Sequence, residues 1–213
     1  MKNKIIGGFL LLFMLTACGS PSETTTTDIP ETTANSDVET TTTDTPEAET
    51  SAESKAPAEG VEITLKDELD GILNSYCLDI AGGNKDVNPD KGLQAHTCYS
   101  YRGELGTDQV FDPSRFTKNT LYMPNYEVCA TLTGLESGAK VGLAACDSSD
   151  LQAIAFTGEG TISPVSAPNM CFTAAQESRF GRGSQHQIRD LTLESCSEDL
   201  ASVQQWRTRT TDD

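Results

Sequence analysis

The sequence has 213 residues and a formal net charge of −17 at pH 7, with only 6% aromatic residues and one tryptophan. Nucleic-acid binding needs clustered lysine and arginine side chains for phosphate contacts, and this acidic chain has no basic stripe, so nucleic acid is excluded as a predicted partner. The chain has seven cysteines and two histidines but no Cys-x-x-Cys pair, which disfavours a structural metal site. We expect neither a metal nor a cofactor.

Residues 1–17 have the pattern of an export signal. Lys2 and Lys4 precede an apolar run over residues 5–17 that is too short to cross a bilayer as a helix. The ending Leu-Thr-Ala-Cys resembles the lipobox of bacterial lipoproteins, which implies cleavage before Cys18 and acylation of that residue. The alternative is a plain secretory signal followed by an incidental cysteine. Acylation predicts a lipid-anchored protein of the bacterial cell envelope, at the outer membrane or the cell surface.

Residues 18–60 are predicted to be a disordered tether that follows the lipidated Cys18. This segment contains repeated threonine runs, no aromatic residue, and ten acidic residues against Lys55 alone. Such a composition cannot bury enough apolar surface to offset the entropy of ordering. At about 3.3 Å per residue, the stretched segment reaches about 140 Å. The tether therefore separates the membrane from residues 61–213.

Residues 61–213 carry one pattern three times. A first cysteine strand, a loop and a second cysteine strand are followed by a polar loop and a Gln-containing apolar segment, which reads DQVF, LQAIAF and VQQW in the three copies. Short apolar runs separated by Gly, Pro and Asn predict an all-β fold. If Cys18 is lipidated, six cysteines remain, a number that suits three disulfides in an oxidising compartment.

This ordered pattern resembles the ricin B chain type of lectin, a β-trefoil in which three pseudo-repeats surround a shared core. The resemblance implies carbohydrate as the ligand and one disulfide inside each copy, namely Cys77–Cys98, Cys129–Cys146 and Cys171–Cys196. It also implies that the Gln-x-Trp residues are structural, here Gln109, Phe111, Gln204 and Trp206. The second copy departs from the motif, because Ile154 follows Gln152 where an aromatic residue is usual.

The first hairpin gathers polar side chains on one face. A hairpin with Cys77 opposite Cys98 places Asp79 opposite His96 and Ala81 opposite Gln94. Side chains alternate at period two along a strand, so Asp79, Gln94 and His96 project on the cysteine face, which we expect to be open to solvent. The other face is apolar.

Such a group of side chains suits a sugar. A carboxylate accepts hydrogen bonds from neighbouring hydroxyls, an amide donates and accepts, and a flat ring packs on the C–H face of a pyranose. The resemblance places the carbohydrate-binding residues at Asp79, Gln94, His96 and Asp108. His96 replaces the more usual Trp or Tyr, and Tyr99 or Tyr101 is a candidate for the missing ring. The structural alternative is local capping, or a hydrogen bond from His96 to Asp79 that only supports the hairpin.

The other two copies lack the carboxylate. Thr131 and Thr173 occupy the position of Asp79, which predicts that these two sites are lost. We find no Gly-x-Ser-x-Gly and no His-Glu-x-x-His motif, so an enzyme is not expected. The leading hypothesis is a surface-anchored lectin with one sugar site. The alternative is a non-catalytic β-trefoil protein-interaction module that has lost sugar binding.

Overall fold

The computed structural model describes residues 60–72, 74–82, 87–99 and 105–210. The predicted signal peptide, the lipidated Cys18, the tether up to residue 59 and Tyr101 lie outside the described residues. The described residues form an all-β, β-trefoil-like fold, in which α1 (Ala201–Gln204) is a single helical turn. Its strands are β1 (Glu62–Leu65), β2 (Tyr76–Ile80), β3 (Leu93–Thr97), β4 (Tyr122–Met123), β5 (Val128–Leu132), β6 (Ala139–Ala144), β7 (Ile154–Ala155), β8 (Glu159–Gly160), β9 (Ser163–Pro164), β10 (Met170–Ala174), β11 (Arg179–Phe180), β12 (Gln187–Ser195) and β13 (Trp206–Arg209). None of the described helices is long and apolar enough to cross a membrane.

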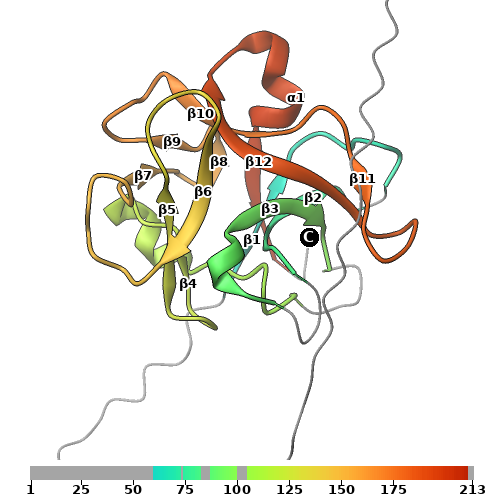
Figure 1. The fold of residues 1–213 in the computed structure, drawn as a ribbon, viewed down its shortest axis with the longest axis horizontal. Helices are drawn as coiled ribbons and strands as arrows, with labels where there is room; N and C mark the ends of the chain where they lie inside the picture. Colours follow the sequence, from blue (N-terminus) through green and yellow to red (C-terminus); the bar gives the residue numbers. More distant parts are fainter. Residues whose placement is uncertain (1–59, 73, 83–86, 100–104, 211–213) are drawn as a thin grey trace, which may run out of the picture. The chain divides into compact units, whose positions relative to one another are not determined.

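Each predicted copy contributes one antiparallel pair that carries a disulfide. The pairs are β2 with β3, β5 with β6, and β10 with β12 (Figure 1). The three disulfides join the cysteines that the family resemblance implied, Cys77–Cys98, Cys129–Cys146 and Cys171–Cys196. The predicted pairing is therefore confirmed in all three copies.

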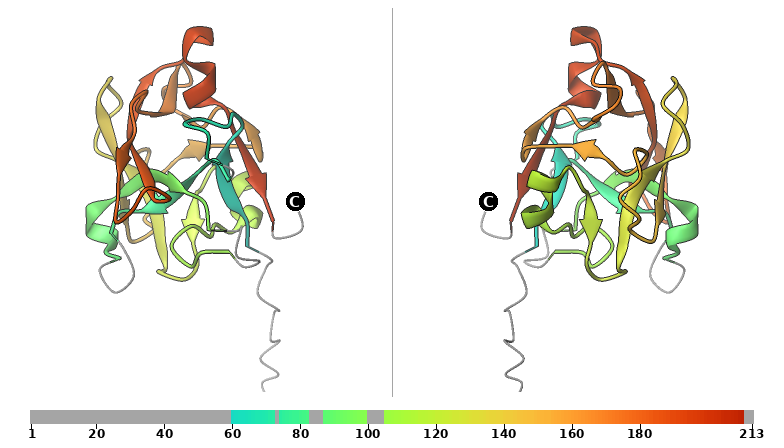
Figure 2. Two further views of the ribbon diagram at one scale, coloured as in Figure 1. Left: turned by 90° about the vertical axis from the view of Figure 1, so that its right-hand side faces the viewer. Right: turned by 90° about the vertical axis from the view of Figure 1, so that its left-hand side faces the viewer.

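Strand β12 connects the three copies. Its second half pairs with β10 of the third copy and, at Thr192 and Leu193, with β6 of the second. Its first half pairs with β3 of the first copy and with β11. The first and last strands of the domain also pair with each other. β1 pairs with β13 over four residues, and the two strands lie side by side in Figure 2. A residue at the start of β12 is thus placed beside the first hairpin.

The glutamine of each copy clamps the chain around the second cysteine. Gln109 Nε2 donates to the carbonyl of Thr97, just before Cys98, and its Oε1 accepts from the backbone N–H of Tyr99, just after it. Gln152 makes the same two bonds around Cys146, and Gln204 around Cys196. These residues are buried and satisfy backbone groups that would otherwise be unpaired. Gln109 and Gln204 are structural, as predicted.

The residue two places after each glutamine lies in the core. Phe111, Ile154 and Trp206 are all fully buried, and Trp206 Nε1 donates to the carbonyl of Phe172. Ile154 therefore occupies the aromatic position without leaving the core.

Gly92 precedes β3 at a point where the backbone lies close to β6. Its φ is 75°, and an added Cβ would lie 2.7 Å from the carbonyl oxygen of Val141 in β6. Glycine tolerates both constraints because it has no side chain.

The predicted register of the first hairpin is wrong by two residues. Cys77 lies opposite His96, and Asp79 lies opposite Gln94. The strand ends at Thr97, and Cys98 follows it with its N–H donating to Ser75, which brings the two cysteine Cα atoms to 5.0 Å. A shift of two preserves the alternation of side chains, so the predicted face of the hairpin survives the error.

We expect replacement of Gln152 by alanine to lower the free energy of unfolding by about 1–3 kcal/mol, because the N–H of Asp147 and the carbonyl of Ala145 lose their partner. Urea denaturation measures the change. Gln205→Ala is the matched control, because the side chain of Gln205 takes no part in a clamp. Equal stability of the two variants would contradict this role of Gln152.

Candidate functional site

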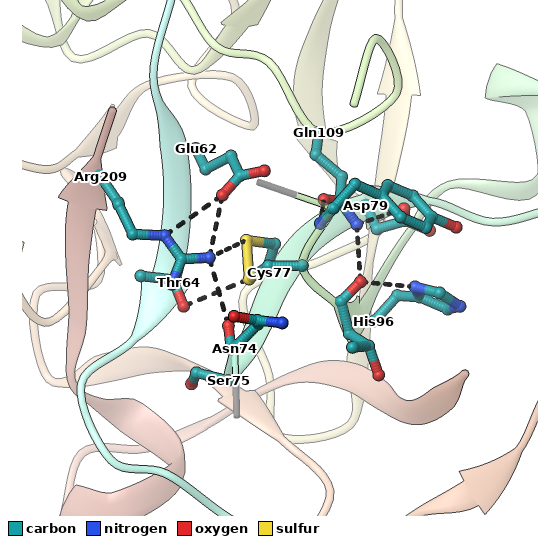
Figure 3. The surroundings of a disulfide bond; sticks show 12 residues. Glu62, Thr64, Asn74, Ser75, Cys77, Asp79, His96, Gln109 and Arg209 are labelled. Atoms are coloured by element: carbon teal, nitrogen blue, oxygen red, sulfur yellow. Dashed lines mark hydrogen bonds and ion pairs between the residues drawn. A yellow bond between two sulfur atoms is a disulfide. The ribbon is translucent and has the colours of Figure 1, made fainter. Parts of the chain in front are cut away.

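The centre of the candidate site is the carboxylate of Asp79, held by two glutamine side chains. Gln94 Nε2 donates to Asp79 Oδ1 and Gln109 Nε2 donates to Asp79 Oδ2, each at 2.9 Å. Figure 3 shows Asp79 and Gln109 beside the Cys77–Cys98 disulfide. Gln94 lies opposite Asp79 in the ladder, whereas Gln109 reaches it from the segment that follows the hairpin. The structure therefore brings Asp79 and Gln94 together, as predicted.

The expected exposure of this face is wrong. Asp79 is only 1% exposed, and Gln94, His96 and Asp108 are also buried. The reason is that the segment ending in Gln109 folds back onto β2, where the N–H of Ile80 donates to the carbonyl of Asp108 at 3.0 Å. Strand β2 is thus packed on both faces.

Burial perturbs both carboxyl groups, and the charge of Asp108 perturbs Asp79 as well. Desolvation raises the pKa of Asp79 well above its ordinary value, and the nearby charge of Asp108 raises it further, while the hydrogen bonds from Gln94 and Gln109 oppose the rise. Desolvation also raises the pKa of Asp108. Burial thus disfavours ionisation of both groups, and a like charge adds to this effect at Asp79.

His96 does not hydrogen-bond Asp79. Its Nδ1 lies 2.9 Å from the carbonyl oxygen of Thr97, and its ring lies 5.3 Å from the ring of Tyr99 and 5.6 Å from that of His186. Burial lowers the pKa of His96. Both oxygens of Asp79 are instead bonded by the glutamine amides, so the suggested His96–Asp79 bond is wrong. Tyr99, a candidate for the missing ring, does lie beside His96.

The corresponding positions of the other copies differ as the sequence indicates. Thr173 Oγ1 accepts from Gln204 Nε2 at 2.8 Å, where Asp79 accepts from Gln109. A cavity of about 540 Å³ lies at this position of the third copy, lined in part by Thr173, Thr192 and Glu194. Thr192 and Ser137 both donate to the Glu194 carboxylate. The third copy thus lacks a carboxylate, because position 173 is a threonine. A cavity is nevertheless present there.

A buried ion pair between Arg209 and Glu62 lies beside the Cys77–Cys98 disulfide of the first hairpin. Arg209 Nη2 in β13 donates to Glu62 Oε2 at 3.0 Å and to the carbonyl of Asn74 at 3.2 Å (Figure 3). The same nitrogen lies 3.9 Å from Cys77 Sγ. Potential metal-ligating atoms of Glu62, Cys77 and Cys98 lie close together there, but the two sulfurs are bonded to each other and offer no thiolate.

Part of the chain matches a known protein family. Residues 117–213 match the family model of the ricin-type beta-trefoil lectin domain. The predicted resemblance is confirmed. The matched range contains the second and third copies of the trefoil, whereas Asp79, Gln94, His96 and Asp108 precede it.

Solved structures with low sequence identity were also found. The chain is similar to the designed threefold-symmetric protein ThreeFoil, with 12% identity, a TM-score of 0.47, and coverage of 70% of this chain and 97% of that chain. It is also similar to the beta-trefoil lectin of the Vibrio vulnificus hemolysin/cytolysin with N-acetyl-D-lactosamine bound, with 16% identity, a TM-score of 0.44, and coverage of 73% and 96%. The search of curated proteins gives no match.

The sequence did not predict two contacts near the candidate site. Gln109 was predicted to be structural, and it also bonds Asp79. His186 lies beside His96, although it belongs to the third copy. The Gln-x-aromatic motif carried a signal for Gln109, whereas the local sequence around His186 carried none, since its place depends on the pairing of β12 with β3.

We expect the contribution of Asp79 to stability to depend on pH. The folded pKa of Asp79 is raised above the ordinary value of 3.8, so the folded state keeps this proton where the unfolded chain has lost it. Stability gained at low pH is therefore lost as the pH rises through the folded pKa, with a slope of at most about 1.4 kcal/mol per pH unit. Relative to Asp79→Asn, wild-type protein should become less stable as the pH is raised from about 4 towards neutral.

Urea denaturation of both proteins at a series of pH values measures this difference. The exposed Asp190 provides a control through Asp190→Asn. A difference between wild type and Asp79→Asn that stays constant with pH would contradict the raised pKa.

Proposed function

We propose that this protein is a non-catalytic, carbohydrate-binding lectin with one sugar site in the first copy, formed by Asp79, Gln94, His96 and Asp108. The observation that carries the proposal is the match of residues 117–213 to a lectin family model. The location in the first copy is supported by Asp79, because this copy alone has a carboxylate at the position that is threonine in the other two. Carbohydrate hydroxyls are donors that a carboxylate can accept.

The proposed mode of sugar binding exchanges one hydrogen bond of Asp79 for another. In the free protein Asp79 Oδ1 accepts from Gln94 and Oδ2 from Gln109. We propose that a sugar hydroxyl replaces the Gln94 amide at Oδ1, while Gln109, which also clamps the backbone, stays in place. The released Gln94 amide can then bond a neighbouring hydroxyl. Such a small site binds a monosaccharide with a Kd of about 1 mM, and many anchored copies give firm attachment through avidity.

The burial of Asp79 favours the second candidate function, a β-trefoil module that has lost sugar binding and binds a protein partner. A closed carboxylate with two internal donors needs no ligand to be satisfied. The two functions differ in what removal of Asp79 does, since only the lectin loses sugar binding.

We expect Asp79→Ala to abolish glycan binding by the full chain, because the acceptor of the sugar hydroxyls is lost. A glycan array with wild type and variant measures this, and circular dichroism checks that the variant folds. Thr173→Ala, the matched change in the third copy, should bind like wild type. Binding that survives in a folded Asp79→Ala protein would exclude this site, and a wild type that binds no glycan would favour the interaction module.

We further propose that acyl chains on Cys18 anchor the protein to the bacterial cell envelope, at the outer membrane or the cell surface. The lipobox-like sequence before Cys18 supports this localisation. Cys18→Ser should move the protein from the membrane fraction to the soluble fraction and remove incorporation of a labelled fatty acid. A variant that stays in the membrane fraction would contradict the anchor.

A further inference from the structure

The hairpin β11–β12 of the third copy projects one side chain towards the first-copy site. Ile188 lies opposite His96 in the ladder between β12 and β3, so both side chains share one face of the sheet. His186 precedes Ile188 by two residues and continues that face. Its ring lies 5.6 Å from His96 and 6.4 Å from Tyr99, so the three rings form one cluster.

The position of His186 is held by backbone contacts on both sides. The N–H of Gln187 donates to Thr97 Oγ1 at 3.0 Å, which ties the start of β12 to the end of β3. His186 itself donates its N–H to the carbonyl of Gly183 and accepts at its own carbonyl from Gly181. His186 therefore lies in a hydrogen-bonded turn directly before β12, next to a residue that is tied to β3.

The rings of this cluster differ in exposure. His96 is only 5% exposed, whereas Tyr99 and His186 are half-buried and present more of their rings to solvent. Gly106 links the cluster to the carboxyl groups, because a Cβ at this residue would meet the ring of Tyr99 and Oδ1 of Asp108. The ring of Tyr99 thus lies beside Asp108, and His186 is the neighbouring ring of the same cluster.

We propose that His186, contributed by the third copy, is a ligand contact of the sugar site in the first copy. Its ring and that of Tyr99 form the surface on which the apolar C–H face of a pyranose packs, and His96 supports both rings from beneath. The inference rests on the proposed sugar site at Asp79 and deepens it. It assigns the missing aromatic surface to a residue from another copy of the trefoil.

The same hairpin contains a matched control. Phe180 lies opposite Gln187 in the β11–β12 ladder, and Gln187 Oε1 accepts from Tyr76 Oη on the other side of the sheet. Phe180 therefore projects away from the face that carries His96 and His186. It is also 70% exposed, so its removal leaves the packing of the hairpin intact.

The test uses the full chain and a panel of free glucose, galactose, mannose, N-acetylglucosamine and fucose, titrated by NMR. We expect His186→Ala to raise the Kd of the bound sugar about three- to tenfold, because one ring contact is lost. His186→Phe should keep most of the affinity, since a flat ring is restored. Phe180→Ala should bind like wild type, and the ring protons of His186 should shift when the sugar is added.

Each result decides the inference. An unchanged Kd in His186→Ala, or an equal loss in Phe180→Ala, overturns it. If Asp79→Ala abolishes binding while His186→Ala does not alter it, the inference fails and the proposed lectin function stands. If the wild type binds no sugar of the panel and no glycan on an array, both fail together.

Discussion

The buried carboxylate of Asp79 is the constraint on which the candidate site depends. An ionised group taken out of water is strongly destabilising unless donors replace its hydration. Here two glutamine amides provide those donors, and one of them, Gln109, also clamps the chain around Cys98. The support of the charge and the support of the fold therefore share one side chain. A group that displaced Gln109 from Asp79 would also break the clamp, whereas displacement of Gln94 would leave the clamp intact.

The three copies separate what the fold requires from what a site requires. Each copy keeps the disulfide, the glutamine clamp and a buried residue two places after the glutamine. The side chain at the position of Asp79 varies, and in the third copy the Thr173 hydroxyl accepts the glutamine N–H in its place. The clamp glutamine can therefore donate to a carboxylate in one copy and to a hydroxyl in another.

Strand β12 makes the copies dependent on one another. It pairs with β10, β6 and β3, so its first half lies in the territory of the first copy. His186 is beside His96 for this reason. Residues of the third copy thus contact the first hairpin, and substitutions in the third copy can alter the surroundings of the candidate site in the first.

The features that repeat along the chain were predictable from the amino-acid sequence. The repeated cysteine and Gln-x-aromatic pattern carried the family resemblance, and that resemblance implied the three disulfides and the structural glutamines. The alternation along a strand placed Asp79, Gln94 and His96 on one face. That face was predictable despite a register error, because a shift of two residues does not change which side a side chain takes. The contact of Gln109 with Asp79 and the contact of His186 with His96 became apparent only from the folded chain. Both depend on where segments distant along the chain fold back onto β2 and β3, and local periodicity contains no information about that packing.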